Sequence, residues 1–260
     1  MTGHQKQQVW RCICGKDPRQ HGFDSGLWTR RIVGQLIDQR FGVSLGPTAI
    51  GNLLAELRIT PQKPLRRAYE RDPKEIERWK TETYPKLRRR SRSRGADIFF
   101  LDEAGFRSDS SLQRTWGAKG KTPEVQTNGR RQSTNAISAI NQQGAFWYNI
   151  YDSRLNAKRF IEFLASFLRR RRRPVFLVVD RHPAHQAKLV AEYVQACKGR
   201  LELHFLPGYA PDLNPDEFVW NYMRECGTSK VPLKKDESLP ARVENDLAAI
   251  KAKYSNSQLR

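Results

Sequence analysis

Apolar positions between residues 27 and 58 recur at helical spacing. The first stripe consists of Trp28, Ile32, Val33, Leu36, Ile37 and Phe41, which fall on one helical face. Gly42–Pro47 interrupts the pattern, and Pro47 suits the first turn of a new helix. The second stripe consists of Ile50, Leu53, Leu54 and Leu57. Two short amphipathic helices joined by a Gly-containing turn predict a helix-turn-helix, with a helical hairpin that only packs as the alternative.

After residue 95 the pattern changes to short continuous apolar runs, which are typical of buried strands. Strands are predicted at 98–101, 135–141, 145–151, 175–179 and 201–205, and helices near 160–168, 189–194, 216–224 and 239–250. A strand meander followed by alternating helices and strands predicts an α/β fold. We expect a mixed sheet flanked by helices, preceded by a small all-α helix-turn-helix domain. Residues 1–20 are polar, and only Val9–Ile13 indicates the stump of a helix.

The charge balance points to a polyanionic partner. The 260 residues carry a formal net charge of +20, and residues 1–95 alone contain 21 Lys and Arg against 9 Asp and Glu. Nucleic acid is the expected partner. An anionic membrane surface is a distant second, and no membrane partner is expected. No apolar run is long enough to span a bilayer. The four cysteines lack CxxC spacing, which favours reduced thiols over a zinc site or a disulfide framework.

Charge and breaker residues divide the chain into three predicted segments. Residues 1–59 form the helix-turn-helix region, 60–95 a basic linker and 96–260 the α/β domain. Within the linker a helix is expected from Pro73 to Lys86, and Lys86–Arg94 holds six cations in nine residues. That run is either a solvated helix end or a phosphate-contacting segment. The candidate DNA-contacting residues are Arg30, Arg31, Thr48, Asn52, Arg58, Arg88, Arg89 and Arg90.

Three carboxylates are set where elements of the α/β domain begin or end. Asp102 follows the apolar run 98–101, Asp180 follows 175–179, and Glu217 stands where a helix should begin, after Asn214-Pro215. Carboxylates that converge in a cleft repel each other, which favours bound divalent cations. Two Mg²⁺ or Mn²⁺ ions about 4 Å apart would serve phosphodiester chemistry, because they activate the attacking oxygen and stabilise the leaving one.

Residues beside these acids allow other interpretations. Strand alternation turns Glu103 to the face opposite Asp102, so a structural role is expected. His182 and His185 resemble a metal pair, but no further nitrogen or sulfur ligands accompany them; His185 is alternatively a substrate or second-sphere contact. Asn214 is expected either to bond the turn backbone or to orient Glu217. Tyr209 is expected to pack in its connector rather than stack on a base.

Three motifs resemble the mariner superfamily of transposases in its bacterial insertion-sequence branch. They are Phe100–Gly105 (FLDEAG), Val178–His185 (VVDRHPAH) and Leu206–Trp220 (LPGYAPDLNPDEFVW), and the segment Thr115–Gly120 is also similar. The resemblance runs roughly from Asp17 to the C-terminus. It implies a ribonuclease-H-like catalytic domain of the DDE type, with Asp102, Asp180 and Glu217 as the catalytic and metal-binding triad. Asp216 is a rival for the third position, but the family pattern Asn-Pro-x-Glu favours Glu217.

The resemblance also implies an activity and partners. They are divalent-metal-dependent cleavage at transposon ends and strand transfer into target DNA. The expected partners are the terminal inverted repeats, target DNA and a second copy of the chain in a DNA-bound homodimer in the bacterial cytoplasm, at the nucleoid. The family usually carries two helix-turn-helix units, so the N-terminus is expected to be truncated. The Arg169–Arg173 run is more basic than the family pattern. The alternatives are an inactive DNA-binding remnant or repressor, and a nuclease for RNA–DNA hybrids.

Overall fold

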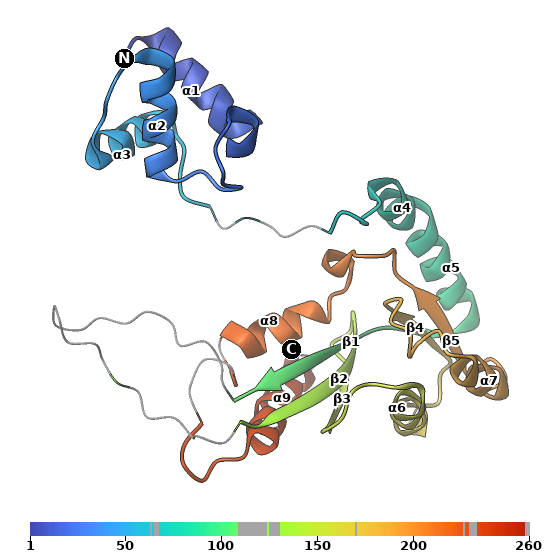
Figure 1. Cartoon of the computed structure of the whole chain (residues 1–260). Helices are drawn as coiled ribbons and strands as arrows, with labels where there is room; N and C mark the ends of the chain where they lie inside the picture. Colours follow the sequence, from blue (N-terminus) through green and yellow to red (C-terminus); the bar gives the residue numbers. More distant parts are fainter. Residues whose placement is uncertain are drawn as a thin grey trace. The chain divides into compact units, whose positions relative to one another are not determined.

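The computed structural model describes residues 1–62, 64, 68–108, 124, 131–169, 171–225, 227–228 and 233–257, with side chains to residue 253. The chain divides into two compact units, an N-terminal unit of Met1–Arg66 and a C-terminal unit of Arg67–Arg260 (Figure 1). Of the features noted in the sequence, Thr115–Gly120, Arg170 and Cys226 lie outside the described residues. No helix in the described ranges combines the length and apolar character needed to cross a membrane.

The N-terminal unit contains the helices α1 (Gly3–Gly15), α2 (Arg30–Phe41) and α3 (Pro47–Glu56), with a 3₁₀ turn at Pro18–His21. Its core consists of Val9, Val33, Ile37, Ile50 and Leu53. The prediction that residues 1–20 hold only a helical stump was wrong. Thr2 and Gln5 form a capping box that begins α1, and only two of its residues are buried, which is why the apolar pattern is weak.

Helices α2 and α3 confirm the predicted helix-turn-helix elements. Thr29 caps α2 by accepting a hydrogen bond from the Ile32 N–H, and Gly42 ends it in the left-handed conformation with φ 63°. Pro47 opens α3. Close packing of the pair requires Gly34, because a Cβ there would lie 2.8 Å from Ile50 Cδ1.

The C-terminal unit is built on one five-stranded sheet. Its strands are β1 (Asp97–Arg107), β2 (Ser133–Asn141), β3 (Phe146–Tyr151), β4 (Val175–Val179) and β5 (Leu201–Phe205). The order is β3-β2-β1-β4-β5, with β1 antiparallel to β2 and parallel to β4. The pairs β2–β3 and β4–β5 are antiparallel and parallel respectively. This confirms the predicted mixed sheet and places β1 at its centre.

Strand β1 is longer than its apolar run predicts. Pairing with β2 continues from Phe99↔Asn141 to Arg107↔Ser133, whereas pairing with β4 stops at Phe100↔Val178. Asp102 therefore lies inside a strand rather than at its end. It stands where β1 has lost its parallel neighbour, which opens that side of the strand.

Helices cover both faces of this sheet. Helices α6 (Ala157–Arg169) and α7 (Lys188–Ala196) pack on the face that bears Phe99 and Leu101. The opposite face is covered by α8 (Glu217–Glu225) and α9 (Leu239–Ser257) over β1–β3. A 3₁₀ turn at Pro211–Leu213 precedes α8. Alternation along β1 thus directs Asp102 and Glu103 to different helical layers.

The basic segment before β1 is largely helical. Helix α4 (Pro73–Arg78), a π-helical segment (Trp79–Thr83) and α5 (Tyr84–Arg94) follow one another as a single rod (Figure 1). Trp79 and Leu87 of this rod pack with Phe100, Phe176, Val178 and Leu206 of the C-terminal unit. The rod therefore belongs structurally to the sheet that it covers.

Several arginines in the two basic runs have structural partners. Arg90 and Arg94 both pair with Glu202 and lie over the Phe176 ring. The Arg171 guanidinium lies 4.1 Å from the ring centroids of both Phe99 and Phe167. Arg173 pairs with Asp97 at 3.2 Å. Part of each run consequently stabilises the fold.

Candidate metal centre

The three acids come from three different elements of the C-terminal unit. Asp102 lies in β1, Asp180 is the first residue after β4, and Glu217 is the first residue of α8. Because Phe100 of β1 pairs with Val178 of the parallel strand β4, Asp102 and Asp180 each follow that pair by two residues, Asp102 within β1 and Asp180 just beyond β4. The two acids therefore occupy the same edge of the β1–β4 pair.

Asp102 is held among other carboxylates. Burial, followed by the charges of Glu217, Asp216 and Glu103, raises the pKa of Asp102 to about 9. At neutral pH its carboxyl keeps a proton unless a cation compensates the charge. Hard oxygen donors with an excess of negative charge fit a divalent ion such as Mg²⁺ or Mn²⁺.

Asn214 attaches the connector before α8 to the strand of Asp102. Its side chain is buried; Nδ2 donates to the Leu101 carbonyl at 3.0 Å, and Oδ1 accepts from the Asp216 N–H at 3.2 Å. The structure thus shows the expected bond within the turn and an additional bond to β1. This cross-link fixes the start of α8 next to the residue that precedes Asp102.

Replacing Asn214 by alanine is expected to destabilise the protein by about 1–3 kcal/mol, because the Leu101 carbonyl and the Asp216 N–H lose a buried partner. Urea denaturation measures the change. The matched control is Asn221→Ala, an exposed position of α8, which should stay within about 0.5 kcal/mol of the parent. Equal destabilisation by the two variants would contradict the role given to Asn214.

Asp216 and Glu217 differ in access to solvent. Asp216 is fully buried, and its Oδ2 accepts from the Ser138 hydroxyl at 2.8 Å. Burial raises the pKa of Asp216 well above its ordinary value, although the Ser138 hydrogen bond opposes the rise. The Glu217 side chain remains 31% exposed. Of the two candidates for the third position, Glu217 is accessible to a ligand, whereas Asp216 is buried and binds Ser138 of β2.

Asp180 is oriented by the loop that follows it. Its Oδ1 accepts from the His182 N–H at 3.0 Å and from His185 Nδ1 at 2.8 Å. Burial raises the pKa of Asp180, but the bonds to His185 and His182 outweigh it, and the net pKa lies below the ordinary value. Asp180 therefore stays ionised under conditions in which Asp102 is protonated.

Glu103 joins Asp180 rather than Asp102. Ligand atoms of Glu103, Asp180 and His185 lie within 4.8 Å of one another, and this is the compact metal-ligating group found among the described residues. Burial and the charge of Asp180 raise the pKa of Glu103 to about 7, while His185 opposes the rise. The acids thus form two clusters, one around Asp102 and one around Asp180.

Glu103 lies on the face opposite Asp102, as predicted; its expected structural role stays a prediction, although its carboxylate joins the compact group. Its position next to Asp102 was the available signal. His182 does not join the compact group; its Nδ1 accepts from the Ala184 N–H at 3.2 Å. Tyr209 is 58% exposed with φ 53°, so the expectation that it packs in its connector was wrong.

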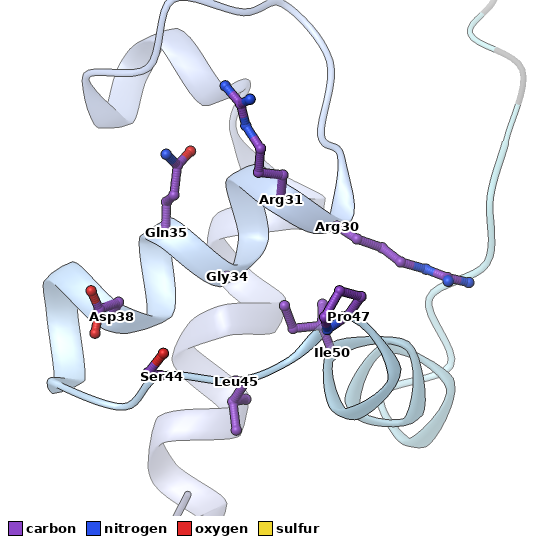
Figure 2. Close-up of a pocket in the computed structure, with 9 residues that line it drawn as sticks. All are labelled: Arg30, Arg31, Gly34, Gln35, Asp38, Ser44, Leu45, Pro47 and Ile50. Atoms are coloured by element: carbon purple, nitrogen blue, oxygen red, sulfur yellow. The ribbon is translucent and has the colours of Figure 1, made fainter.

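The residues predicted to contact DNA are exposed and lie in two places. Arg30, Arg31, Thr48, Asn52 and Arg58 lie in the N-terminal unit, and Arg88, Arg89 and Arg90 lie on α5. Arg90 is occupied by its pair with Glu202. A hollow of about 460 Å³ opens between α2 and α3, and Figure 2 shows Arg30 and Arg31 leaving α2 in different directions at its rim.

A mixed sheet of order β3-β2-β1-β4-β5 with helices on both faces is the ribonuclease-H-like fold. The family described as DDE superfamily endonuclease matches residues 97–240. The chain belongs to this family. A second family, described as winged helix-turn helix, matches residues 24–83.

Solved structures of the Mos1 transposase share the fold. The Mos1 strand transfer complex has a TM-score of 0.60 and 17% identity over 93% of this chain and 76% of that chain. The Mos1 paired-end complex with the left transposon end has 0.61 and 18% over 93% and 74%. The Mos1 mariner paired-end complex with Mn has 0.60 and 16% over 93% and 77%. No curated protein matches the chain.

Proposed function

We propose that this protein is a mariner-type DNA transposase of the bacterial insertion-sequence branch. It cleaves DNA at the ends of a mobile element and joins the freed 3′-hydroxyl to target DNA. The observation that carries the proposal is the cross-link by which Asn214 brings Glu217 to Asp102. The match to the DDE superfamily endonuclease family over residues 97–240 and the match to winged helix-turn helix over residues 24–83 support the proposal.

The proposed catalytic and metal-binding residues are Asp102, Asp180 and Glu217. These three carboxylates would hold the divalent ions, and two Mg²⁺ or Mn²⁺ ions are expected. Asp180 and Glu217 need not contact each other to hold separate ions, which is compatible with one cluster of carboxylates around Asp102 and another around Asp180. When bound, such ions activate the attacking oxygen and stabilise the leaving oxygen.

The chain's own side chains prepare this site. Asn214 fixes the start of α8 to β1, which keeps Glu217 near enough for its charge to act on Asp102. The His185 side chain, through Nδ1, and the His182 backbone N–H both donate to Oδ1 of Asp180. Asp102 gives up its proton when cations bind, because their charge replaces it.

DNA recognition is proposed for the N-terminal unit. Residues 1–59 would bind the terminal inverted repeats, 60–95 would supply cations, and 96–260 would hold the chemistry. Arg30, Arg31, Thr48, Asn52 and Arg58 are the proposed contacts, with Arg88 and Arg89 on α5 as further phosphate contacts. Arg90 is a weaker candidate because Glu202 already binds it.

Binding to duplex DNA is expected to fall steeply with salt, because each Lys or Arg contact releases counterions. Six or more phosphate contacts would lower the affinity by at least about 10³ between 50 and 200 mM salt. Fluorescence anisotropy measures the slope, which should become shallower by about 1 in Arg31→Ala. Lys188→Ala removes an exposed charge of α7 and should leave it unchanged. A flat salt response would contradict the proposed interface.

The activity is tested with duplex DNA that carries the inverted repeats flanking the coding sequence. Incubation with Mg²⁺ or Mn²⁺ should cut at the repeat ends, and Asp180→Ala should remove the cutting. Activity of Asp180→Ala at the parental rate would refute the assigned site. Strict preference for RNA–DNA hybrids would instead establish the hybrid nuclease.

An inactive DNA-binding remnant is not favoured, because the endonuclease family match contains all three acids. Two ends must be brought together for transposition, so we propose a homodimer on DNA. We propose that it works in the bacterial cytoplasm, at the nucleoid.

A further inference from the structure

His185 lies between two carboxylates that belong to different elements. Its Nδ1 is 2.8 Å from Asp180 Oδ1, and its Nε2 is 3.8 Å from Glu103 Oε2. The side chain is completely buried, and its ring packs on Phe160 with centroids 4.4 Å apart. Glu103, His185 and Asp180 therefore form a continuous row of side chains, which runs from β1 to the proposed metal site.

Two atoms of this row have no conventional partner. Within the described part of the chain, buried His185 Nε2 and Glu103 Oε2 make no hydrogen bond, yet they face each other. Leaving such groups unpaired in a protein interior is unfavourable. Packing alone does not explain why a histidine and a glutamate occupy these positions.

The other ring nitrogen of His185, Nδ1, binds and orients Asp180. Asp180 follows the end of β4, and its side chain is 51% exposed, so the strand alone does not fix its direction. The two donors, the His182 N–H and His185 Nδ1, both reach Oδ1. Oδ2 accepts no hydrogen bond from any described residue, which leaves it available to a ligand.

We infer that His185 is a positioning residue for Asp180, and that Glu103 supports it from the far side of the ring. This inference rests on the proposed function. The Asp180 carboxylate selects the tautomer with the proton on Nδ1, and Glu103 confronts Nε2, so the ring cannot turn without losing both. His185 and Glu103 thus lie in the outer coordination sphere of the proposed site, where a hydrogen bond from the histidine orients the metal-binding carboxylate of Asp180.

Substitutions of His185 that each retain a nitrogen at only one of the two ring-nitrogen positions test this inference. In His185→Asn the amide nitrogen takes the place of Nδ1, and in His185→Gln it takes the place of Nε2. His185→Phe keeps the ring and its contact with Phe160 but has neither donor. The kcat for end cleavage should fall by about 10–100-fold in His185→Phe. The Mg²⁺ concentration for half-maximal rate should rise, while the KM for DNA should not change.

Rescue distinguishes positioning from packing. His185→Asn should recover most of the rate and of the Mg²⁺ dependence, and His185→Gln should not. Equal behaviour of the Asn and Gln variants, or an unchanged Mg²⁺ dependence in a folded His185→Phe protein, would overturn the inference. Because the Asn and Gln variants are compared with each other, the test stands even if the Phe variant fails to fold.

A cation bound directly by Glu103, Asp180 and His185 is the other outcome. Electron paramagnetic resonance of Mn²⁺ with ¹⁵N-histidine-labelled protein separates the two. The inference predicts Mn²⁺ binding weakened in His185→Phe without nitrogen hyperfine coupling in the parent. Coupling to labelled histidine would overturn it by making His185 a ligand. This readout needs no DNA cleavage, so failure of the proposed function remains distinguishable.

Discussion

Replacing Asp102 by asparagine is expected to remove cleavage and, at the same time, to stabilise the metal-free protein. Asparagine has nearly the same size but cannot carry the charge that holds cations. A loss of about 4 kcal/mol of transition-state stabilisation lowers the rate by about a thousandfold. Cleavage of end-containing DNA should therefore decrease at least that much, with little change in DNA binding.

The stability effect has the opposite sign because Asp102 lies beside Glu217, Asp216 and Glu103. At neutral pH the folded metal-free protein must hold a proton on Asp102 that the unfolded chain has released, and asparagine removes this cost. Each kcal/mol gained raises the melting temperature by about 2–4 °C in a protein of this size. Asp236→Asn, an exposed acid of the same unit, serves as the control and should change neither property. Asp102→Asn protein that cleaves within tenfold of the parent, or that melts lower than the parent, would contradict the account.

The metal-free protein is expected to lose stability as the pH rises from about 4 to about 9. The folded pKa of Asp102, about 9, lies above the unfolded value near 3.9, so the unfolded chain releases this proton first. The stabilisation is complete below the unfolded pKa and is lost as the pH rises through the folded one. Glu103, with a pKa of about 7, adds to the loss up to neutral pH.

Mg²⁺ should remove this loss, because bound cations compensate the ionised carboxylates. At one hundred times its dissociation constant, a ligand stabilises the folded state by about 2.7 kcal/mol. Calorimetric melting at several pH values, with and without Mg²⁺, measures both effects. Protons released on Mg²⁺ binding should appear as a buffer-dependent enthalpy.

The Asp102→Asn variant shows how much of the pH-dependent loss of stability comes from Asp102, because its other titrating groups are those of the parent. Its pH slope should be shallower, and Mg²⁺ should stabilise it less. Asp180 has the opposite effect on folding stability. Its pKa is lowered in the folded state, so its stabilising contribution is lost only as the pH falls. A parental slope in the Asn variant would show that Asp102 does not titrate as described.

Much of the fold could be predicted because its signals are local. The fully buried strand β4 is a continuous apolar run, and α2 and α3 have clear apolar stripes. The third motif contains the Asn-Pro that precedes Glu217, so the start of α8 was visible. In these elements each residue's pattern agrees with its final environment.

Other features depend on contacts that no local pattern encodes. Helix α1 buries only Val9 and Cys12, so its apolar stripe is too sparse to recognise. The length of β1 is set by its partner β2, not by its own apolar run. The three segments predicted with boundaries at 59 and 95 stay a prediction, although the rod of α4 and α5 packs on the sheet.

The site shows the same limit. Asp102, Asp180 and Glu217 were singled out because each follows or begins an element. The row of Glu103, His185 and Asp180 joins residues from β1 and the loop after β4, and only the three-dimensional fold brings them together. Ser138 likewise meets Asp216 across 78 positions of sequence.

Anomalous diffraction from crystals of the protein with Mn²⁺ would show directly which carboxylates bind the ions, because it locates the ions without assuming a reaction. We expect Mn²⁺ peaks that share Asp102 as a ligand, with Asp180 on one ion and Glu217 on the other. A peak bound by Glu103 and His185 alone, or Mn²⁺ that leaves Asp102 without a contact, would contradict this expectation.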